Sequence, residues 1–161
     1  MTRPWALSLA ALLGCSEAAT GSPKASSTSG ELGWSERFGT PGADFARAAA
    51  LDASGDLYIA GYSDGSFAGS TNAGFWDAFL TRLRPGGDAI WTAQWGSAAT
   101  DFAQGVVIGP DGAVFVAGYT AGDVGDRGNA GGLDAFVTRY EPSGDQSWTR
   151  QWGSERDDHV Y

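Results

Sequence analysis

Residues 34–90 read WSERFGTPGADFARAAALDASGDLYIAGYSDGSFAGSTNAGFWDAFLTRLRPGGDAI, and residues 91–147 repeat that pattern as WTAQWGSAATDFAQGVVIGPDGAVFVAGYTAGDVGDRGNAGGLDAFVTRYEPSGDQS. The two stretches align without a gap and are identical at about 20 positions, mostly glycines, aspartates and aromatic residues. Trp34, Trp91 and Trp148 mark a period of 57 residues, so residues 148–161 begin a third repeat. Because gapless spacing fixes the loop lengths, both repeats are predicted to form the same supersecondary unit.

Each repeat predicts four short strands. Phe79, Thr81 and Leu83 alternate with Leu80 and Arg82, which is the period of a pleated strand and not of a helix. The 25 glycines and the many aromatic residues of the chain favour tight turns and β-structure. The strands are expected at residues 46–51, 57–63, 78–83 and 90–95, and at residues 103–108, 114–120, 135–140 and 147–152.

Four antiparallel strands per repeat are typical of a β-propeller blade. The pattern W-x3-[FW]-G, D-F-A, A-G-Y, D-A-F-[LV]-T-R and P-x-G-D resembles the SBBP family, whose repeats are regarded as blades of a seven-bladed propeller in bacterial surface and secreted proteins. We therefore expect an all-β fold of two four-stranded antiparallel blades within residues 33–161. WSERFG, at residues 34–39, corresponds to a fourth strand and is expected as one orphan N-terminal strand.

The expected propeller is incomplete. Seven repeats of this length need more than twice the 161 residues of the chain. Three explanations are open: a truncated gene product, a fragment of a larger propeller, or a subunit that completes a ring by self-assembly with further copies. All three arise because two open blades expose edges that propellers normally cover. Truncation or a fragment is favoured, because the sequence stops shortly after an Asp-Asp pair without a capping segment.

The N-terminus predicts export. Residues 1–14 contain Arg3 and an apolar run from Trp5 to Leu13, which is far shorter than the roughly 20 residues of a membrane span and suits a signal peptide. Leu12-Leu13-Gly14-Cys15 resembles the lipobox of bacterial lipoproteins, which implies lipidation of Cys15 and an anchor in the cell envelope, at the outer membrane or cell surface. The alternative is an ordinary signal peptide that leaves Cys15 unmodified. Residues 15–32 have too few large apolar side chains to pack and are expected to form a flexible tether.

Charge, cysteine content and aspartate spacing argue against nucleic-acid binding, disulfide bonds and a bound cofactor or metal. A net charge of −9 argues against nucleic acid, because phosphates are bound by clustered Lys and Arg. A single cysteine permits no intramolecular disulfide. No cofactor or metal is predicted, since the aspartate spacing matches no EF-hand or nonapeptide calcium motif and no Cys-His cluster exists.

The repeated polar and aromatic residues are interpreted as structural. A residue that every blade needs recurs in every blade, whereas a catalytic residue is needed once, and no catalytic set can be assembled. Turn and strand-start hydrogen bonds are therefore expected for Asp44, Asp77, Asp101, Asp134 and Asp158. Packing between blades is expected for Trp34, Trp91, Trp95, Trp148 and Trp152.

One face of the blades is predicted to carry the variable loops. In an up-and-down blade, the loops between the second and third strands emerge together with the connections between blades, at residues 64–75, 121–132, 40–43 and 97–100. Trp76 is singled out because its counterpart in the second repeat is Leu133. The candidate ligand-binding residues on this face are Asp64, Trp76, Asp123, Asp126 and Arg127.

Two functions are consistent with these features. The first is a surface-anchored, non-enzymatic propeller module for binding or scaffolding, with a protein or a polysaccharide as ligand. The second is a fragment of a propeller enzyme of the hydrolase, lyase or quinoprotein type, whose catalytic residues lie in other blades. A non-repeated polar constellation would favour the enzyme, and the sequence presents none.

Overall fold

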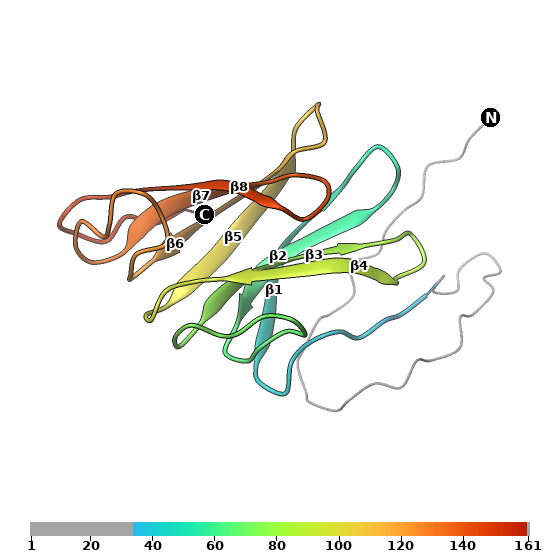
Figure 1. Ribbon diagram of the computed structural model, residues 1–161, viewed down its shortest axis with the longest axis horizontal. Coiled ribbons are helices and arrows are strands. Elements are labelled where there is room, and N and C mark those ends of the chain that lie inside the picture. Colours follow the sequence, from blue (N-terminus) through green and yellow to red (C-terminus); the bar gives the residue numbers. More distant parts are fainter. Residues whose placement is uncertain (1–33, 161) are drawn as a thin grey trace.

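The computed structural model describes residues 34–160, which form strands and turns without any helix. Two antiparallel sheets of four strands each lie side by side and do not close into a ring (Figure 1). The strands of each sheet pair in chain order, as expected for two blades of an open propeller. The first sheet consists of β1 (Asp44–Leu51), β2 (Leu57–Ser63), β3 (Asp77–Leu83) and β4 (Ala89–Trp95), and the second of β5 (Asp101–Ile108), β6 (Val114–Thr120), β7 (Asp134–Tyr140) and β8 (Gln146–Trp152).

All eight expected strands are present, and their first residues differ from the prediction by at most two positions. The differences fall mainly at aspartates: β1 and β5 begin at Asp44 and Asp101, and β3 and β7 at Asp77 and Asp134. In the first sheet, Asp44 and Asp77 both pair with Ser63, from its two sides. Their backbone therefore belongs to the sheet although their residue type suggests a turn.

Glycines with positive φ make the tight turns at one end of both sheets. Gly55 and Gly112, with φ of 87° and 81°, close the hairpins that join the first two strands of each sheet. Gly87 and Gly144, with φ of 91° and 98°, close the hairpins between the last two strands. Other residues rarely adopt this backbone conformation, which explains why these four glycines recur at the 57-residue period.

The main core lies between the two sheets. Tyr58 and Leu80 of the first sheet and Phe136 and Tyr140 of the second are at most 2 % exposed and belong to one cluster. Half-buried Trp91 and Trp95 of β4 pack against it, so the fourth strand of one blade covers the next. A second cluster, formed by Ile59, Phe67, Phe79 and Leu83, occupies the opposite face of the first sheet.

The expected orphan strand at residues 34–39 is not a strand: these residues have no regular secondary structure. The physical reason is that a fourth strand must pair with a third, and among residues 34–160 both β3 and β7 already have two neighbours. The segment nevertheless takes the position of a fourth strand. Phe38 contacts Phe79 edge-on at 6.3 Å, and Trp95 contacts Phe136 edge-on at the same distance.

The predicted signal peptide at residues 1–14, the lipidated Cys15 and the tether at residues 15–32 lie outside the described residues. Within residues 34–160, no helix has the length and apolar character needed to cross a membrane.

Candidate functional site

The loops predicted to be variable lie together at one end of both sheets, which we call the loop face. The amide of Asp64 donates to the carbonyl oxygen of Ala43, and that of Ala121 donates to Thr100. These two bonds join the end of the second strand of each blade to the segment that precedes its first strand. In Figure 1 the loops lie at the left and lower left, and the glycine hairpins point to the top and right.

Three of the five repeated aspartates brace the segments that precede each first strand. Oδ2 of Asp44 accepts a hydrogen bond from the amide of Thr40, at 2.7 Å. Asp101 accepts the equivalent bond from Ser97 at 2.6 Å, and Asp158 from Ser154 at 2.6 Å. The hydroxyl groups of Thr40, Ser97 and Ser154 also donate to these carboxylates. The predicted turn and strand-start role of these aspartates is confirmed.

Asp77 and Asp134 hold the loops that precede the third strands. Their Oδ2 atoms accept from the amides of Ala73 at 2.8 Å and Ala130 at 2.9 Å. Their Oδ1 atoms are buried and have no hydrogen-bond partner. The turn role is again confirmed, and each side chain retains one unsatisfied oxygen.

Asp77 and Asp101 come together at the junction of the blades, against Gly96. A Cβ atom added to Gly96 would lie 2.5 Å from Oδ1 of Asp77 and 2.8 Å from Oδ2 of Asp101, so only glycine fits between the two carboxylates. Burial raises the pKa of Asp77, and the charge of Asp101 raises this pKa further. Burial also raises the pKa of Asp101, against the lowering effect of its bonds from Ser97 and Thr120.

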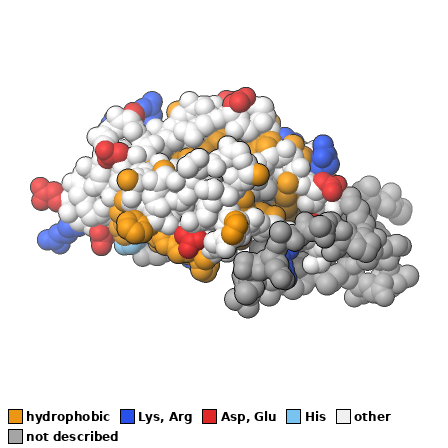
Figure 2. All heavy atoms as spheres, turned by 60° about the horizontal axis from the view of Figure 1, so that its bottom comes forward, with side chains coloured by type: hydrophobic (Ala, Val, Ile, Leu, Met, Phe, Trp, Pro, Cys, Tyr) orange, Lys and Arg blue, Asp and Glu red, His pale blue; other side chains and the backbone are white. Residues whose placement is uncertain are grey.

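Aromatic side chains form a continuous row along the loop face. Phe45 stacks on Tyr62 at 5.2 Å, and Tyr62 contacts Phe102 edge-on at 4.5 Å. Phe102 contacts Tyr119 at 5.3 Å, and Tyr119 contacts His159 edge-on at 4.9 Å. The Tyr62–Phe102 and Tyr119–His159 contacts are equivalent in the repeat. The row therefore crosses both blades, and Figure 2 shows hydrophobic side chains gathered beside the histidine.

Trp76 extends this row at the first blade. Its ring contacts Tyr62 at 5.5 Å and Phe45 at 5.6 Å, edge-on to both. Its backbone forms a parallel bridge with Thr100, and its carbonyl oxygen accepts the amide of Asp101 at 2.7 Å. The indole remains half-exposed, and neighbouring Phe75 is 73 % exposed.

The other four candidates do not form one constellation. Oδ1 of Asp64 accepts the amide of Ala43 at 2.6 Å, whereas Asp123 accepts the amide of Asn129 within the second loop. Asp126 forms an exposed ion pair with Arg150. Arg127 is exposed beside it.

A shallow hollow of about 430 Å³ lies on the loop face where the two blades meet. Its lining comes from the connection between the blades and from the start of the second variable loop, and consists of Ser97, Ala98, Ala99, Gly122 and Asp123. Asp123 is the only one of the five candidates in this lining. Ser97 connects the hollow to buried Asp101 through its hydroxyl, which donates at 3.0 Å.

The repeated tryptophans pack between blades, as predicted, where a second blade is present. Trp91 stacks on Tyr140 at 6.3 Å, and an added Cβ at Gly144 would lie 2.9 Å from its ring. Trp34 lies over Gly87 in the equivalent way, at 3.0 Å from such a Cβ atom. Trp148 and Trp152 of β8 are 37 % and 49 % exposed.

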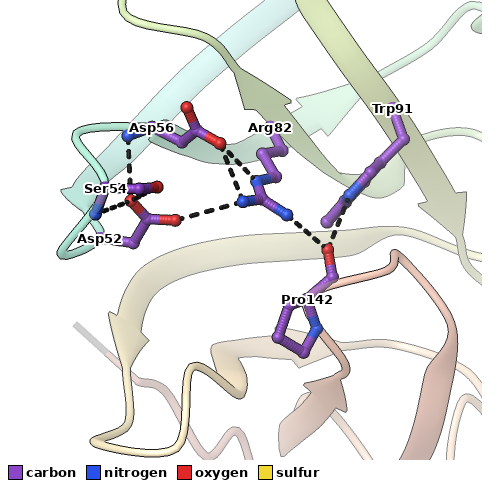
Figure 3. A network of polar contacts seen from close by, with 6 residues as sticks. All are labelled: Asp52, Ser54, Asp56, Arg82, Trp91 and Pro142. Carbon is purple, nitrogen blue, oxygen red and sulfur yellow. Dashed lines mark hydrogen bonds and ion pairs between the residues drawn. The ribbon is translucent and has the colours of Figure 1, made fainter.

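A cluster of hydrogen bonds and ion pairs around Arg82, which we call the polar clamp, joins the two blades and was not predicted from the sequence. Nε and Nη2 of Arg82 bind Asp56, at 3.0 and 2.8 Å, and its Nη1 donates to the carbonyl oxygen of Pro142 in the other blade, at 2.7 Å (Figure 3). Nε1 of Trp91 donates to the same oxygen at 3.2 Å. The recurring Thr-Arg pair at residues 81–82 and 138–139 was the available signal, because an arginine that repeats in register has a structural partner.

The part of the chain that the structure describes holds no group of three or more His, Cys, Asp or Glu residues placed to bind a metal ion. Comparison with protein families matches residues 33–68 to the SBBP family, described as a beta-propeller repeat. No curated protein matches the chain significantly. The matched residues include β1, β2 and the first connection of the loop face, all of which recur in the second sheet at the 57-residue period. Residues 33–68 therefore carry the beta-propeller repeat of the SBBP family.

Proposed function

We propose that this chain is a non-enzymatic binding module of the bacterial cell envelope, anchored at the outer membrane or cell surface by a lipid on Cys15. Its ligand is contacted by the aromatic row Phe45, Tyr62, Phe102 and Tyr119 together with Trp76. The lipobox-like sequence at residues 12–15 supports the anchor. The binding role is supported by the row of aromatic rings in mutual contact along the loop face.

The single observation that carries the proposal is the exposure of aromatic rings that lie in ring-to-ring contact. Phe45 is 46 % exposed at the start of the row, and Trp76 is half-exposed against it. Aromatic rings offer large apolar faces for stacking, and exposed apolar patches on a folded protein mark interaction sites. Trp76 has no aromatic counterpart in the second repeat, so packing of the repeat does not account for it.

The surrounding charges favour a neutral ligand. Asp64, Asp123 and Asp126 lie on the loops that border the row, and the chain carries a net charge of −9. These charges repel polyanions, nucleic acid among them. Arg47 and Gln104 lie two residues beyond Phe45 and Phe102 and bind each other at 3.0 Å, so polar groups flank the rings. Rings bordered by polar groups suit a neutral polysaccharide, with a protein segment as the other ligand class.

Affinity electrophoresis of the folded chain through gels containing a neutral β-glucan or a neutral mannan tests the proposal. We expect retardation in at least one gel, and a loss of most of that retardation in the Trp76→Ala and Phe45→Ala variants. Trp148→Ala is the matched control, since it removes an exposed tryptophan that lies on β8. Its retardation by polysaccharide, relative to a gel without polysaccharide, should equal that of the unchanged chain. Retardation that Trp76→Ala leaves intact, or migration unaffected by both polysaccharides, contradicts binding of neutral polysaccharide by the aromatic row.

A further inference from the structure

The outer surface of β8 presents half of a blade-to-blade interface. Trp148 and Trp152 stand 57 residues after Trp91 and Trp95, which cover the second sheet. Trp95 is in contact with Phe136 at 6.3 Å and with Tyr140 at 5.2 Å. Trp148 and Trp152 are instead 37 % and 49 % exposed.

The complementary half of that interface is on the first sheet of the same chain. Phe79, Leu83 and the Gly87 turn are the equivalents of Phe136, Tyr140 and the Gly144 turn. In the structure this surface is occupied by Trp34, which lies over Gly87, and by Phe38, which contacts Phe79 at 6.3 Å. A surface that accepts two aromatic side chains at this spacing is thus already formed.

We propose that the chain self-associates head to tail, with Trp148 and Trp152 of one copy docking on the Phe79–Leu83–Gly87 surface of a second copy. The docking tryptophans replace Trp34 and Phe38 of the receiving copy. The contact is heterologous, because two different surfaces meet, and such contacts generate rings when the rotation closes.

The polar clamp between the blades has its counterpart in this arrangement. Arg82 and Trp91 both donate to the carbonyl oxygen of Pro142. Arg139 and Trp148 are their equivalents and would meet the carbonyl oxygen of Pro85 in the receiving copy. In the single chain Arg139 binds instead to Ser147 at 2.8 Å and to Glu141. Docking therefore adds a carbonyl acceptor to the contacts of Arg139, whose side chain is 22 % exposed.

Docking also requires one local exchange. Residues 153–160 of the docking copy and residues 39–46 of the receiving copy are equivalent in the repeat and occupy the same place. Residues 153–160 contain no strand, whereas Asp44–Ala46 belong to β1. Residues 153–160 of the docking copy are therefore the segment that moves aside. Phe45 of the receiving copy then replaces His159 against Tyr119, which continues the aromatic row from one copy to the next.

Sedimentation velocity of the full chain carrying Cys15→Ser, which prevents lipid-driven association, tests the proposal over a range of concentrations. We expect a discrete assembly of two or more copies, and a dissociation constant at least about tenfold larger for Trp148→Ala/Trp152→Ala than for the Cys15→Ser chain. Circular dichroism of this variant should be unchanged, because both tryptophans are partly exposed. A chain that remains monomeric at every concentration overturns the proposal.

Three further variants separate docking from nonspecific association. Trp34→Ala/Phe38→Ala clears the receiving surface and should strengthen association, and adding Trp148→Ala/Trp152→Ala to it should abolish that gain. Phe75→Ala removes a more exposed aromatic residue from the loop face and should leave association unchanged. Association that survives the fourfold variant, or that falls equally with Phe75→Ala, contradicts the assigned surfaces.

Discussion

Arg82 of β3 donates from Nη1 to the carbonyl oxygen of Pro142, 60 residues further along the chain and in the other blade. The same guanidinium binds Asp56 at 2.8 Å and Asp52 at 3.4 Å within its own blade. Arg82→Ala removes the bond between the blades and leaves both carboxylates without their cation. We expect it to lower the free energy of unfolding by about 2 kcal/mol, measured by urea denaturation.

Arg139→Ala is the matched control for this prediction. Arg139 is equivalent in the repeat but makes its contacts within the second blade, to Glu141, Ser147 and the 62 % exposed side chain of Asp111. Its removal from monomeric protein should change the free energy of unfolding much less than Arg82→Ala does, because exposed ion pairs contribute little to stability. Equal losses from both arginines would contradict a clamp that joins the blades.

Trp91 stabilises the interface between the blades through both packing and hydrogen bonding. It is half-buried, stacks on Tyr140, and donates to Pro142. Trp91→Ala should cost about 3 kcal/mol of unfolding free energy, because it leaves a cavity in the shared core. Trp148→Ala, measured in the same way on monomeric protein, should cost less than about 1 kcal/mol. Comparable costs for the two tryptophans would show that the two sheets do not pack as described.

Asp77 makes stability fall as pH rises. Burial raises its pKa in the folded state, so the folded chain holds this proton more tightly than the unfolded chain does. The associated stability is complete below the unfolded pKa of about 3.9 and is lost as pH rises through the folded pKa. Asp77→Asn should therefore raise the urea midpoint at pH 7, since its amide keeps the Ala73 bond and can donate toward Asp101. The gain should shrink toward pH 4.

Asp44→Asn supplies the contrasting control. Both carboxylate oxygens of Asp44 accept hydrogen bonds from Thr40, so an amide group at this position loses an acceptor and gains nothing. We expect a loss of about 1 kcal/mol at pH 7. A stabilising Asp44→Asn, or a destabilising Asp77→Asn, would refute the distinction between the two aspartates.

Lipidation of Cys15 is tested by metabolic labelling with a radioactive fatty acid in a bacterial host. The unchanged chain should incorporate the label and sediment with membranes, because the attached acyl chains hold it there. Cys15→Ser should remain unlabelled and move to the soluble fraction. Label in both chains, or in neither, would contradict a lipid anchor at this cysteine.

Much of the fold could be predicted from the sequence, because the repeat constrains it twice. Gapless alignment places the hairpin glycines and the strands of one blade on their counterparts, so each of these elements is indicated by two sequences. The starts of β1 and β3 were placed too late, since Asp44 and Asp77 pair in the sheet through their backbone while their side chains bind the loops. The prediction of an orphan strand at residues 34–39 was wrong. Trp34 and Phe38 reproduce the side-chain packing of a fourth strand, but their backbone does not pair with another strand.

Less of the candidate site could be predicted. Trp76 stands out in the sequence because it breaks the repeat, whereas Phe45, Tyr62, Phe102 and Tyr119 obey the repeat and give no sign of a binding role. Periodicity separates structural from unique residues, but it cannot indicate which structural side chains remain exposed. The clamp from Arg82 to Pro142 was missed for a related reason: a side chain that binds a distant backbone carbonyl leaves no pairing pattern in the sequence.

The central claim is that the aromatic row on the loop face is the binding surface of this chain. Hydrogen–deuterium exchange of the folded chain, with and without the neutral polysaccharide that retards it, tests this claim most directly. Protection should appear in residues 64–76 and 97–102, which surround Trp76 and Phe102, and exchange at the Gly55 and Gly112 hairpins should be unchanged. Protection confined to those hairpins or to β8 would contradict the claim.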